Sequence, residues 1–171
     1  MAHSAIQKIT RTALLLVVTL LLQGLRLVIP VPPQISLFFI GSLVNACLVI
    51  AVLRTDLKAG SVIAVAAPVF AYLEGMLPLP FFIPVVAVGN LVYVVFIWAL
   101  QQYGLRKLYI AAFLKAIVLF GGFSLLFALV QVPPKITHMI LFAMSWPQIV
   151  TGIIGLVVGY AVSQRLKKVD R

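Results

Sequence analysis

The chain has 171 residues, of which 64% are hydrophobic, and a mean hydropathy of +1.22, which exceeds the roughly half-apolar composition of a soluble domain. Its 13 Lys and Arg residues oppose 3 acidic ones; they lie in short gaps between apolar runs and form no aromatic-interleaved patch, so nucleic acid is not an expected partner. Cys47 is the single cysteine, which excludes an intrachain disulfide or a CxxC redox motif.

Apolar runs divide the sequence into six candidate membrane helices. A hydrocarbon core about 30 Å thick needs ~20 apolar residues per helix, with a range of roughly 17 to 25. Each run ends at proline, glycine or charge, which stop a helix or require water. The predicted spans are 12–29, 35–53, 60–77, 83–100, 108–130 and 146–162. A further apolar segment, 136–144, is too short to span and is predicted to be interfacial or re-entrant.

Membrane-spanning strands are a poor alternative to these helices. A transmembrane barrel strand needs about ten residues that alternate between apolar and polar, whereas these runs are apolar on every side. No long repeat, low-complexity tract or polar linker divides the chain. The sequence therefore predicts one all-α membrane domain of six helices over residues 1–171.

The distribution of basic residues predicts the orientation of these helices. Cytoplasmic loops carry an excess of Lys and Arg. With the N-terminus in the cytoplasm, only Arg26 and Lys135 lie on the outer side. The cytoplasmic set is Lys8, Arg11, Arg54, Lys58, Arg106, Lys107, Arg165, Lys167, Lys168 and Arg171. We therefore expect both termini inside, because one helix more or fewer would scramble this alternation.

Polar side chains at membrane depth are candidates for function, because a central charge costs about 2.5 to 3.5 kcal/mol on insertion scales. With this orientation, most of them are predicted to lie in the outer half of the bundle. They are Gln23, Arg26, Asn45, Tyr72, Glu74, Asn90, Tyr93, Trp146, Gln148 and Thr151. The distribution indicates a polar site that a ligand reaches from outside.

Several of these residues also have a simpler structural interpretation. Glu74 is either an interfacial carboxylate in contact with water or an acceptor for NH groups of a substrate. Asn45 and Asn90 are suited to bonding across helices, and Trp146 to anchoring a helix at the interface. Lys115 is placed about 10 Å inside its helix from the cytoplasmic face, where snorkelling toward the headgroups is the simpler interpretation.

Pairs of small residues four positions apart indicate close contacts between helices. Ala67 and Ala71 form one pair, and Gly155 and Gly159 form another. Packing within this bundle is the favoured interpretation, and an interface with a partner is the alternative.

The sequence lacks the residues that several classes of enzyme require. Asp and Glu do not cluster, and His3 and His138 lie far apart without the spacing of metal ligands. No G-x-S-x-G, Walker A or dinucleotide-binding fingerprint occurs. We therefore expect a protein that is not an enzyme, with no catalytic residue, no metal and no cofactor. Energy for any transport would come from another subunit.

Four segments carry a resemblance to a known family. They are Val31-Pro-Pro-Gln34 through Gly41-Ser-Leu-Val-Asn45, Ala67-Pro68 through Glu74-Gly75, Gly89-Asn90-Leu-Val-Tyr93 and Ser145-Trp-Pro-Gln148. They resemble the substrate-binding S component of energy-coupling factor (ECF) vitamin transporters. The resemblance extends over nearly the whole chain, and it adds to the six-helix pattern with both ends inside.

This resemblance implies an S-component-like bundle in a bacterial or archaeal cytoplasmic membrane. Such a protein binds a vitamin or related micronutrient from outside and topples against a transmembrane coupling protein (EcfT) driven by two ATPase subunits. The substrate-binding residues expected here are Asn90, Tyr93, Glu74, Trp146, Gln148, Gln34 and Asn45, with Gln34 as a lid contact. Their aromatic and amide groups suit a planar, largely neutral heterocycle.

The chain departs from the family pattern in its first helix. Family members often carry an Ala-x-x-x-Ala surface there for the coupling protein, whereas Ala13 is followed by Val17. The docking surface therefore cannot be assigned from this motif.

Two other interpretations stay open. The chain also resembles the rod-shape morphogenesis protein MreD, which shares this architecture without transporting a substrate. That resemblance predicts that Asn90, Tyr93, Glu74 and Gln148 are dispersed packing contacts. A lipid-modifying enzyme would need an acid or base near the headgroups, and only Glu74 and His138 could serve.

Overall fold

The computed structural model describes residues 2–29 and 32–169, apart from the side chains of residues 2–4, 33, 34 and 169. All regular structure in this part of the chain is helical. The elements are α1 (Ala2–Val28), α2 (Pro33–Arg54), α3 (Leu57–Leu73), α4 (Phe82–Leu100), the 3-10 helix η1 (Gln101–Tyr103), α5 (Leu105–Leu129), α6 (Pro134–Ala143) and α7 (Trp146–Val169).

Five helical segments of the described chain are long and apolar enough to cross a membrane. They are α1, α2, α4 extended by η1, α5, and α6 taken together with α7, with hydropathies between 1.7 and 2.4. α3 is also apolar but has only 17 residues, at the lower edge of the spanning range. The prediction of an all-helical, multi-pass membrane protein is therefore confirmed.

The predicted third span, 60–77, is wrong at its outer end. α3 stops at Leu73, and the backbone N–H of Glu74 closes the last turn on Phe70. Gly75 follows with a φ of +76°, a left-handed conformation that glycine adopts without strain and that commonly ends a helix. Glu74 therefore lies just beyond the helix rather than inside it.

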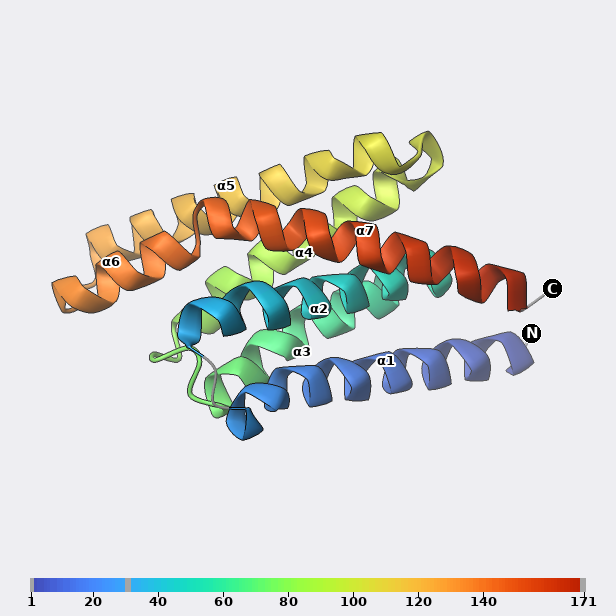
Figure 1. Cartoon of the computed structure of the whole chain (residues 1–171), viewed down its shortest axis with the longest axis horizontal. Helices are drawn as coiled ribbons and strands as arrows, with labels where there is room; N and C mark the ends of the chain where they lie inside the picture. The colour runs from blue at the N-terminus through green and yellow to red at the C-terminus, as the bar shows by residue number, and fades with distance from the viewer. Residues whose placement is uncertain (1, 30–31, 170–171) are drawn as a thin grey trace.

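The short apolar segment predicted at 136–144 forms a helix of its own, α6, which is separated from α7 by a turn (Figure 1). Met144 and Ser145 make this turn, and the Ser145 hydroxyl donates a hydrogen bond of 2.7 Å to the Phe142 carbonyl. Since α6 packs against α5 and α7, the start of α7 lies about 15 Å, the length of α6, inward from the outer end of α5.

α2 occupies the middle of the bundle, where it packs most extensively against α7 and also contacts α1, α3 and α4. Gly155 and Gly159 permit the close approach of α7. A Cβ atom at Gly155 would lie 2.7 Å from the carbonyl oxygen of Ser42, and one at Gly159 would lie 2.8 Å from that of Ala46. The predicted packing of this glycine pair within the bundle is confirmed.

The first turn of α1 and the last turn of α7 lie at the same end of the bundle (Figure 1). The opposite end carries the connections from α1 to α2, from α3 to α4 and from α5 to α6. The two ends of the described chain therefore lie at the same end of the bundle.

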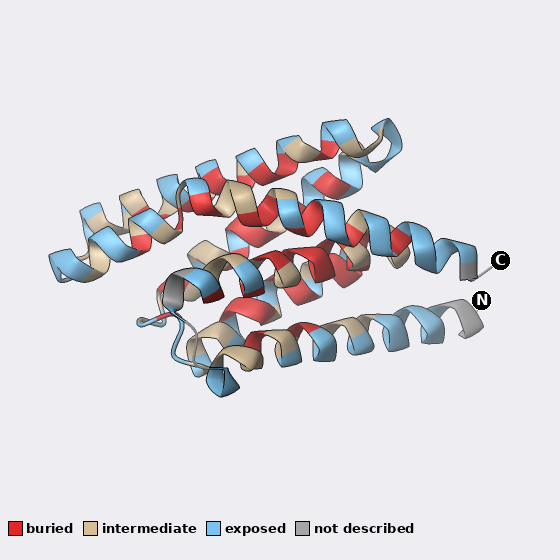
Figure 2. Cartoon of the chain, viewed as in Figure 1, coloured by how far each residue is buried: buried red, intermediate tan, exposed pale blue. Residues whose placement is uncertain are grey.

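α1 is the most peripheral long helix. Figure 2 shows that most buried residues lie on the helices other than α1 and that α1 is largely exposed toward its N-terminus. Among the described side chains of α1, those of Thr19 and Gln23 are buried. Ile6, Ile9, Leu14 and Leu21 are each more than 60% exposed. In a bilayer such a surface faces lipid or another apolar helix, because either environment accepts it without cost.

Candidate functional site

Four polar side chains from four helices meet near the middle of the bundle. Lys115 of α5 donates a hydrogen bond of 2.6 Å from Nζ to Oδ1 of Asn45 in α2. Asn45 Nδ2 in turn donates to Thr151 Oγ1 of α7 at 3.3 Å. The Tyr93 ring of α4 lies 5.2 Å from Lys115 Nζ, measured to the ring centroid. We call these residues, Asn45, Tyr93, Lys115 and Thr151, the polar core.

The polar core is buried and directly connected to α7. All four side chains are at most 4% exposed. The Tyr93 hydroxyl donates a hydrogen bond of 2.7 Å to the carbonyl of Gly152, and Thr151 Oγ1 donates to the carbonyl of Gln148 at 3.3 Å. The polar core therefore joins the first two turns of α7 to α2, α4 and α5.

The sequence placed Asn45 and Tyr93 in the outer half of the bundle, but the polar core lies close to mid-depth. Lys115 is about 15 Å along α5 from Leu105, and Asn45 is about 18 Å along α2 from Pro33. Both positions are near the midpoint of their helices. A ligand held here would be enclosed by the bundle rather than bound at its surface.

Lys115 does not snorkel. A snorkelling lysine carries its ammonium to the headgroups, whereas Lys115 is only 4% exposed and its Nζ bonds to Asn45. In the described part of the chain no carboxylate lies within 4 Å of this nitrogen. An ammonium has three donors, and one of them is engaged by a protein acceptor here.

The other residues predicted to bind substrate lie around the polar core or apart from it. Asn90 is buried one turn before Tyr93, but its Nδ2 donates to the Ala64 carbonyl of α3 at 3.4 Å. Gln148 Nε2 donates to the Ala143 carbonyl at 3.0 Å across the α6–α7 turn. Trp146 is 52% exposed and packs against aromatic rings of α2 and α6. Gln34 is among the residues whose side chains are not described.

Cross-helix bonding, the simpler interpretation of both asparagines, is confirmed. Asn45 links α2 to α5 and α7, and Asn90 links α4 to α3. Ordinary interhelical contacts of this kind stabilise a membrane bundle. The asparagines thus hold the bundle together whether or not a ligand also uses them.

Glu74 belongs to a second polar group at the C-terminal end of α1. Its Oε1 would lie 3.9 Å from a Cβ at Gly24, so its side chain extends back along α1. Four buried atoms in this region have no hydrogen-bond partner among the described residues: Gln23 Oε1, Arg26 Nε, Ser36 Oγ and Glu74 Oε2. Burial raises the pKa of the Glu74 carboxyl above its ordinary value, while the positive charge of Arg26 opposes that shift.

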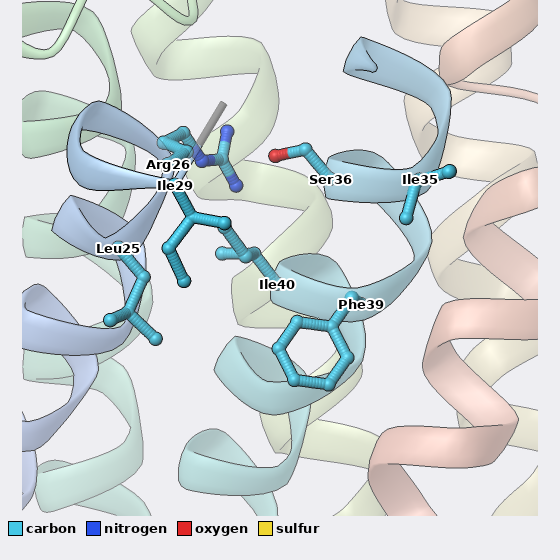
Figure 3. A pocket seen from close by; sticks show the side chains of 7 residues that line it. All are labelled: Leu25, Arg26, Ile29, Ile35, Ser36, Phe39 and Ile40. Carbon is cyan, nitrogen blue, oxygen red and sulfur yellow. The ribbon is translucent and has the colours of Figure 1, made fainter. Parts of the chain in front are cut away.

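A cavity of about 110 Å³ opens beside Arg26 and Ser36, between α1 and α2. Figure 3 shows the Ser36 hydroxyl pointing toward the Arg26 guanidinium, and the surface of the cavity itself is apolar. The remaining lining residues are Leu25, Ile29, Ile35, Phe39 and Ile40. A second cavity, of about 230 Å³, lies at the other end of the bundle between α1, α2 and α7. Neither cavity is lined by a residue of the polar core.

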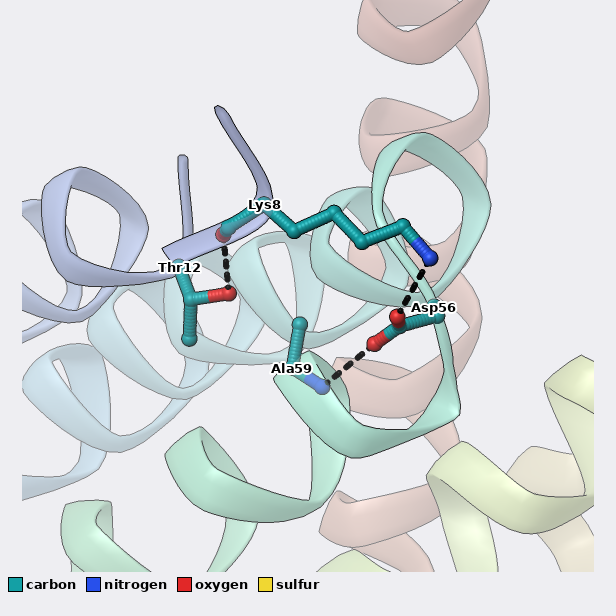
Figure 4. A network of polar contacts seen from close by, with 4 residues as sticks. All are labelled: Lys8, Thr12, Asp56 and Ala59. Carbon is teal, nitrogen blue, oxygen red and sulfur yellow. Dashed lines mark hydrogen bonds and ion pairs between the residues drawn. The ribbon is translucent and has the colours of Figure 1, made fainter. Parts of the chain in front are cut away.

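Polar contacts at that other end fix the start of α3. Asp56 is the N-cap of α3, and its Oδ1 accepts a hydrogen bond of 2.9 Å from the backbone N–H of Ala59. Its Oδ2 forms an ion pair of 3.1 Å with Lys8 of α1 (Figure 4). The bond from Ala59, followed by that from Lys8, lowers the pKa of Asp56 from its ordinary value. This cluster is structural, because each group in it is satisfied by a neighbour.

Comparison of the chain with family models gives no match, and comparison with curated proteins and with solved structures gives none either.

Two residues with unusual environments were not among the binding residues predicted from the sequence. Lys115 was recognised as a polar residue at membrane depth, but the sequence of one helix does not show which neighbouring helix its side chain contacts. Ser36 gave no signal, because small hydroxyl residues are tolerated in membrane helices and only the three-dimensional structure shows its hydroxyl buried without a partner.

Proposed function

We propose that this protein is the substrate-binding S subunit of an ECF-type importer and that its ligand carries a negatively charged group. The observation that carries this proposal is the buried amino group of Lys115, which has one amide oxygen and one aromatic face as neighbours and no carboxylate within 4 Å among the described residues. Charges at membrane depth are expensive and are retained mostly where they act on a substrate or ion.

A second feature favours an anionic ligand at the same place. α7 begins inside the bundle, because α6 occupies the outer part of that path. The N-terminal end of a helix carries a partial positive charge, and interrupted membrane helices direct such ends at anionic groups of substrates. Lys115 and the first turns of α7 therefore present positive charge toward the same region. This argues against the wholly neutral heterocycle suggested by composition alone.

In this proposal the ligand replaces contacts that the polar core makes within the protein. The Asn45 amide oxygen occupies one donor of Lys115, and Tyr93 bonds to Gly152. A carboxylate or phosphate entering from the outer side would displace the amide oxygen and use the free donors of the ammonium. An anionic group adds charge–charge attraction that the neutral amide oxygen cannot supply, so the exchange favours the bound state.

The remaining parts of the proposal follow from the S-component resemblance. The protein would lie in a bacterial or archaeal cytoplasmic membrane with six crossings, α3 being the shortest, and with both termini inside. It would deliver its ligand by toppling against the coupling protein, to which the two ATPase subunits supply energy. The exposed apolar surface of α1 is available for such a partner, since it contacts only α2 and α3 extensively.

A structural role of the MreD type is the second candidate, and one observation favours it. Each side chain of the polar core already has a partner within the protein, and neither of the two described cavities reaches it. On this account Lys115 and Asn45 only hold α2 to α5.

Mass spectrometry of small molecules released from the denatured, purified protein separates these candidates. The S-subunit proposal predicts one anionic small molecule in the wild type and its loss from the K115M variant. The matched control is K135M, which removes a lysine that is exposed at the start of α6 and should retain the molecule. Recovery of lipid and detergent alone would favour the structural role, and a neutral molecule retained by K115M would refute the anionic part.

A further inference from the structure

The backbone hydrogen bonds of α3 are interrupted at Pro68, and side chains of two neighbouring helices bond to the carbonyls there. From these contacts we infer that α3 is jointed at Pro68. The side-chain bonds from Asn90 and Gln23 form a latch that holds the C-terminal segment of the helix, residues 69–73, in place. This inference does not depend on a ligand in the polar core.

The joint begins with a carbonyl that lacks its helical partner. Pro68 lies inside α3, which runs from Leu57 to Leu73. Proline has no backbone N–H, so the carbonyl four residues earlier in the helix loses its donor. In α3 this carbonyl belongs to Ala64, which is fully buried. A buried carbonyl without a donor is costly, because no water replaces the missing bond.

Asn90 of α4 supplies the missing donor. Its Nδ2 donates a hydrogen bond of 3.4 Å to the Ala64 carbonyl, and its side chain is only 5% exposed. Side chains of neighbouring helices satisfy backbone groups that a proline frees in a membrane helix. Asn90 is therefore a positioning residue, which acts through the backbone of α3.

Gln23 of α1 bonds to the same turn of α3. Its Nε2 donates a hydrogen bond of 3.1 Å to the carbonyl of Ala67, the residue directly before Pro68. A backbone carbonyl has two lone pairs, so this bond is compatible with a helical one. Donors from α1 and α4 thus converge on the turn that Pro68 interrupts.

The packing of α3 also changes at Pro68. The buried residues of the helix are Ala59, Gly60, Ile63, Ala64, Ala67 and Pro68. Beyond Pro68, Val69, Phe70 and Leu73 are 39%, 37% and 69% exposed. A segment with few buried contacts opens at a lower free energy than a buried one. Residues 69–73 therefore depend on the latch more than the rest of α3 does.

The latch connects the most peripheral long helix to the neighbourhood of the polar core. Gln23 belongs to α1, and Asn90 lies one turn before Tyr93 in α4. A partner that displaces α1 would separate Gln23 from Ala67 and release one half of the latch. The segment freed in this way leads directly to Glu74, where α3 ends.

Hydrogen–deuterium exchange of the full-length protein in nanodiscs, measured by mass spectrometry of peptic peptides, tests the joint. N90L and Q23L should each accelerate exchange at residues 69–77 by roughly fivefold, which corresponds to about 1 kcal/mol for one hydrogen bond. Exchange at residues 57–63 and in α5 should stay unchanged. Q101L is the matched control, because Gln101 Nε2 also donates to a backbone carbonyl, that of Trp98, but in an exposed position outside α3.

Removing the proline distinguishes a joint from ordinary packing. P68A restores the N–H that bonds to Ala64, so it should slow exchange at residues 69–77 on its own, and N90L/P68A should exchange as P68A does. P68A therefore tests the joint even where N90L fails to fold.

Three results would overturn the inference. They are unchanged exchange at residues 69–77 in both N90L and P68A, equal acceleration by N90L throughout the bundle, and an acceleration by N90L that P68A does not remove. None of these measurements involves a ligand, so their outcome leaves the transport proposal untouched.

Discussion

Replacing Asn45 by Leu should destabilise the protein mainly because it leaves Lys115 charged and without its hydrogen-bond acceptor. Asn45 Oδ1 accepts the bond of 2.6 Å from Lys115 Nζ, and Asn45 Nδ2 donates to Thr151 at 3.3 Å. Losing a hydrogen bond to a charged group costs about 1.5 to 3 kcal/mol, and an average interhelical bond in a membrane adds about 0.6 kcal/mol. We therefore expect N45L to cost about 3 kcal/mol.

The K115M substitution should have a much smaller effect on its own. It removes both the charge and the need for an acceptor, and methionine has a similar length and is apolar. The substitution leaves the Asn45 amide oxygen buried without a donor, which costs about 1 kcal/mol, whereas replacing both partners by apolar side chains is often neutral. We expect K115M to cost about 1 kcal/mol, and N45L/K115M to be within about 1 kcal/mol of K115M.

Equilibrium unfolding in mixed micelles of mild detergent and SDS, followed by circular dichroism, measures the free energies of unfolding of the wild type, N45L, K115M and N45L/K115M. The account predicts a coupling energy of about 2 kcal/mol between the two positions, within the range found for contacting residues. Additive effects of N45L and K115M would refute the argument, because they would show that the ammonium does not depend on the amide.

Three further substitutions test particular contacts by the same unfolding assay. G155A should cost about 1 to 3 kcal/mol, because the new methyl group would lie 2.7 Å from the Ser42 carbonyl oxygen. The control G121A, where nothing lies within 4 Å of the new methyl group, should be neutral or stabilising. Equal effects of the two substitutions would contradict the packing of α7 on α2. Y93F should cost about 1 kcal/mol through the lost bond to Gly152, and no loss would show that the bond is not needed. D56A should cost about 1 kcal/mol as a lost N-cap. Because the pKa of Asp56 is lowered below 3.8 in the folded state, its contribution is present above that pH and is lost as the pH falls through the folded pKa, so the wild type should approach D56A in acid; a difference that persists at low pH would contradict this assignment.

The helices and their order could be predicted because hydrocarbon selects for long apolar runs, and proline and charge mark their ends. The break between α6 and α7 was visible for the same reason, since 136–144 is too short to cross. The end of α3 was misplaced because Met76 and Leu77 continue the apolar run beyond Glu74, and hydropathy does not distinguish a helical turn from the left-handed turn that Gly75 makes.

The candidate site was only partly predictable. The depth of a side chain in the membrane follows from its position along one helix, whereas the neighbours that it meets depend on how several helices pack. Asn45, Tyr93 and Thr151 were recognised as polar groups at membrane depth, and the structure brings them together. The Lys115 side chain was wrongly predicted to extend toward the headgroups, because no local pattern shows that α2 places an amide oxygen 2.6 Å from its Nζ. Glu74 and Asn90 were grouped with them by sequence, but they face α1 and α3.

The central claim is that the polar core is where a transported ligand binds, and an equilibrium binding isotherm tests it most directly. Calorimetric titration of the small molecule identified from the purified protein would be carried out on wild type, K115M and K135M in nanodiscs. The account predicts that K115M binds at least roughly tenfold more weakly, since one charge-assisted bond is lost, and that K135M binds as the wild type does. Equal affinity of K115M and the wild type would contradict it.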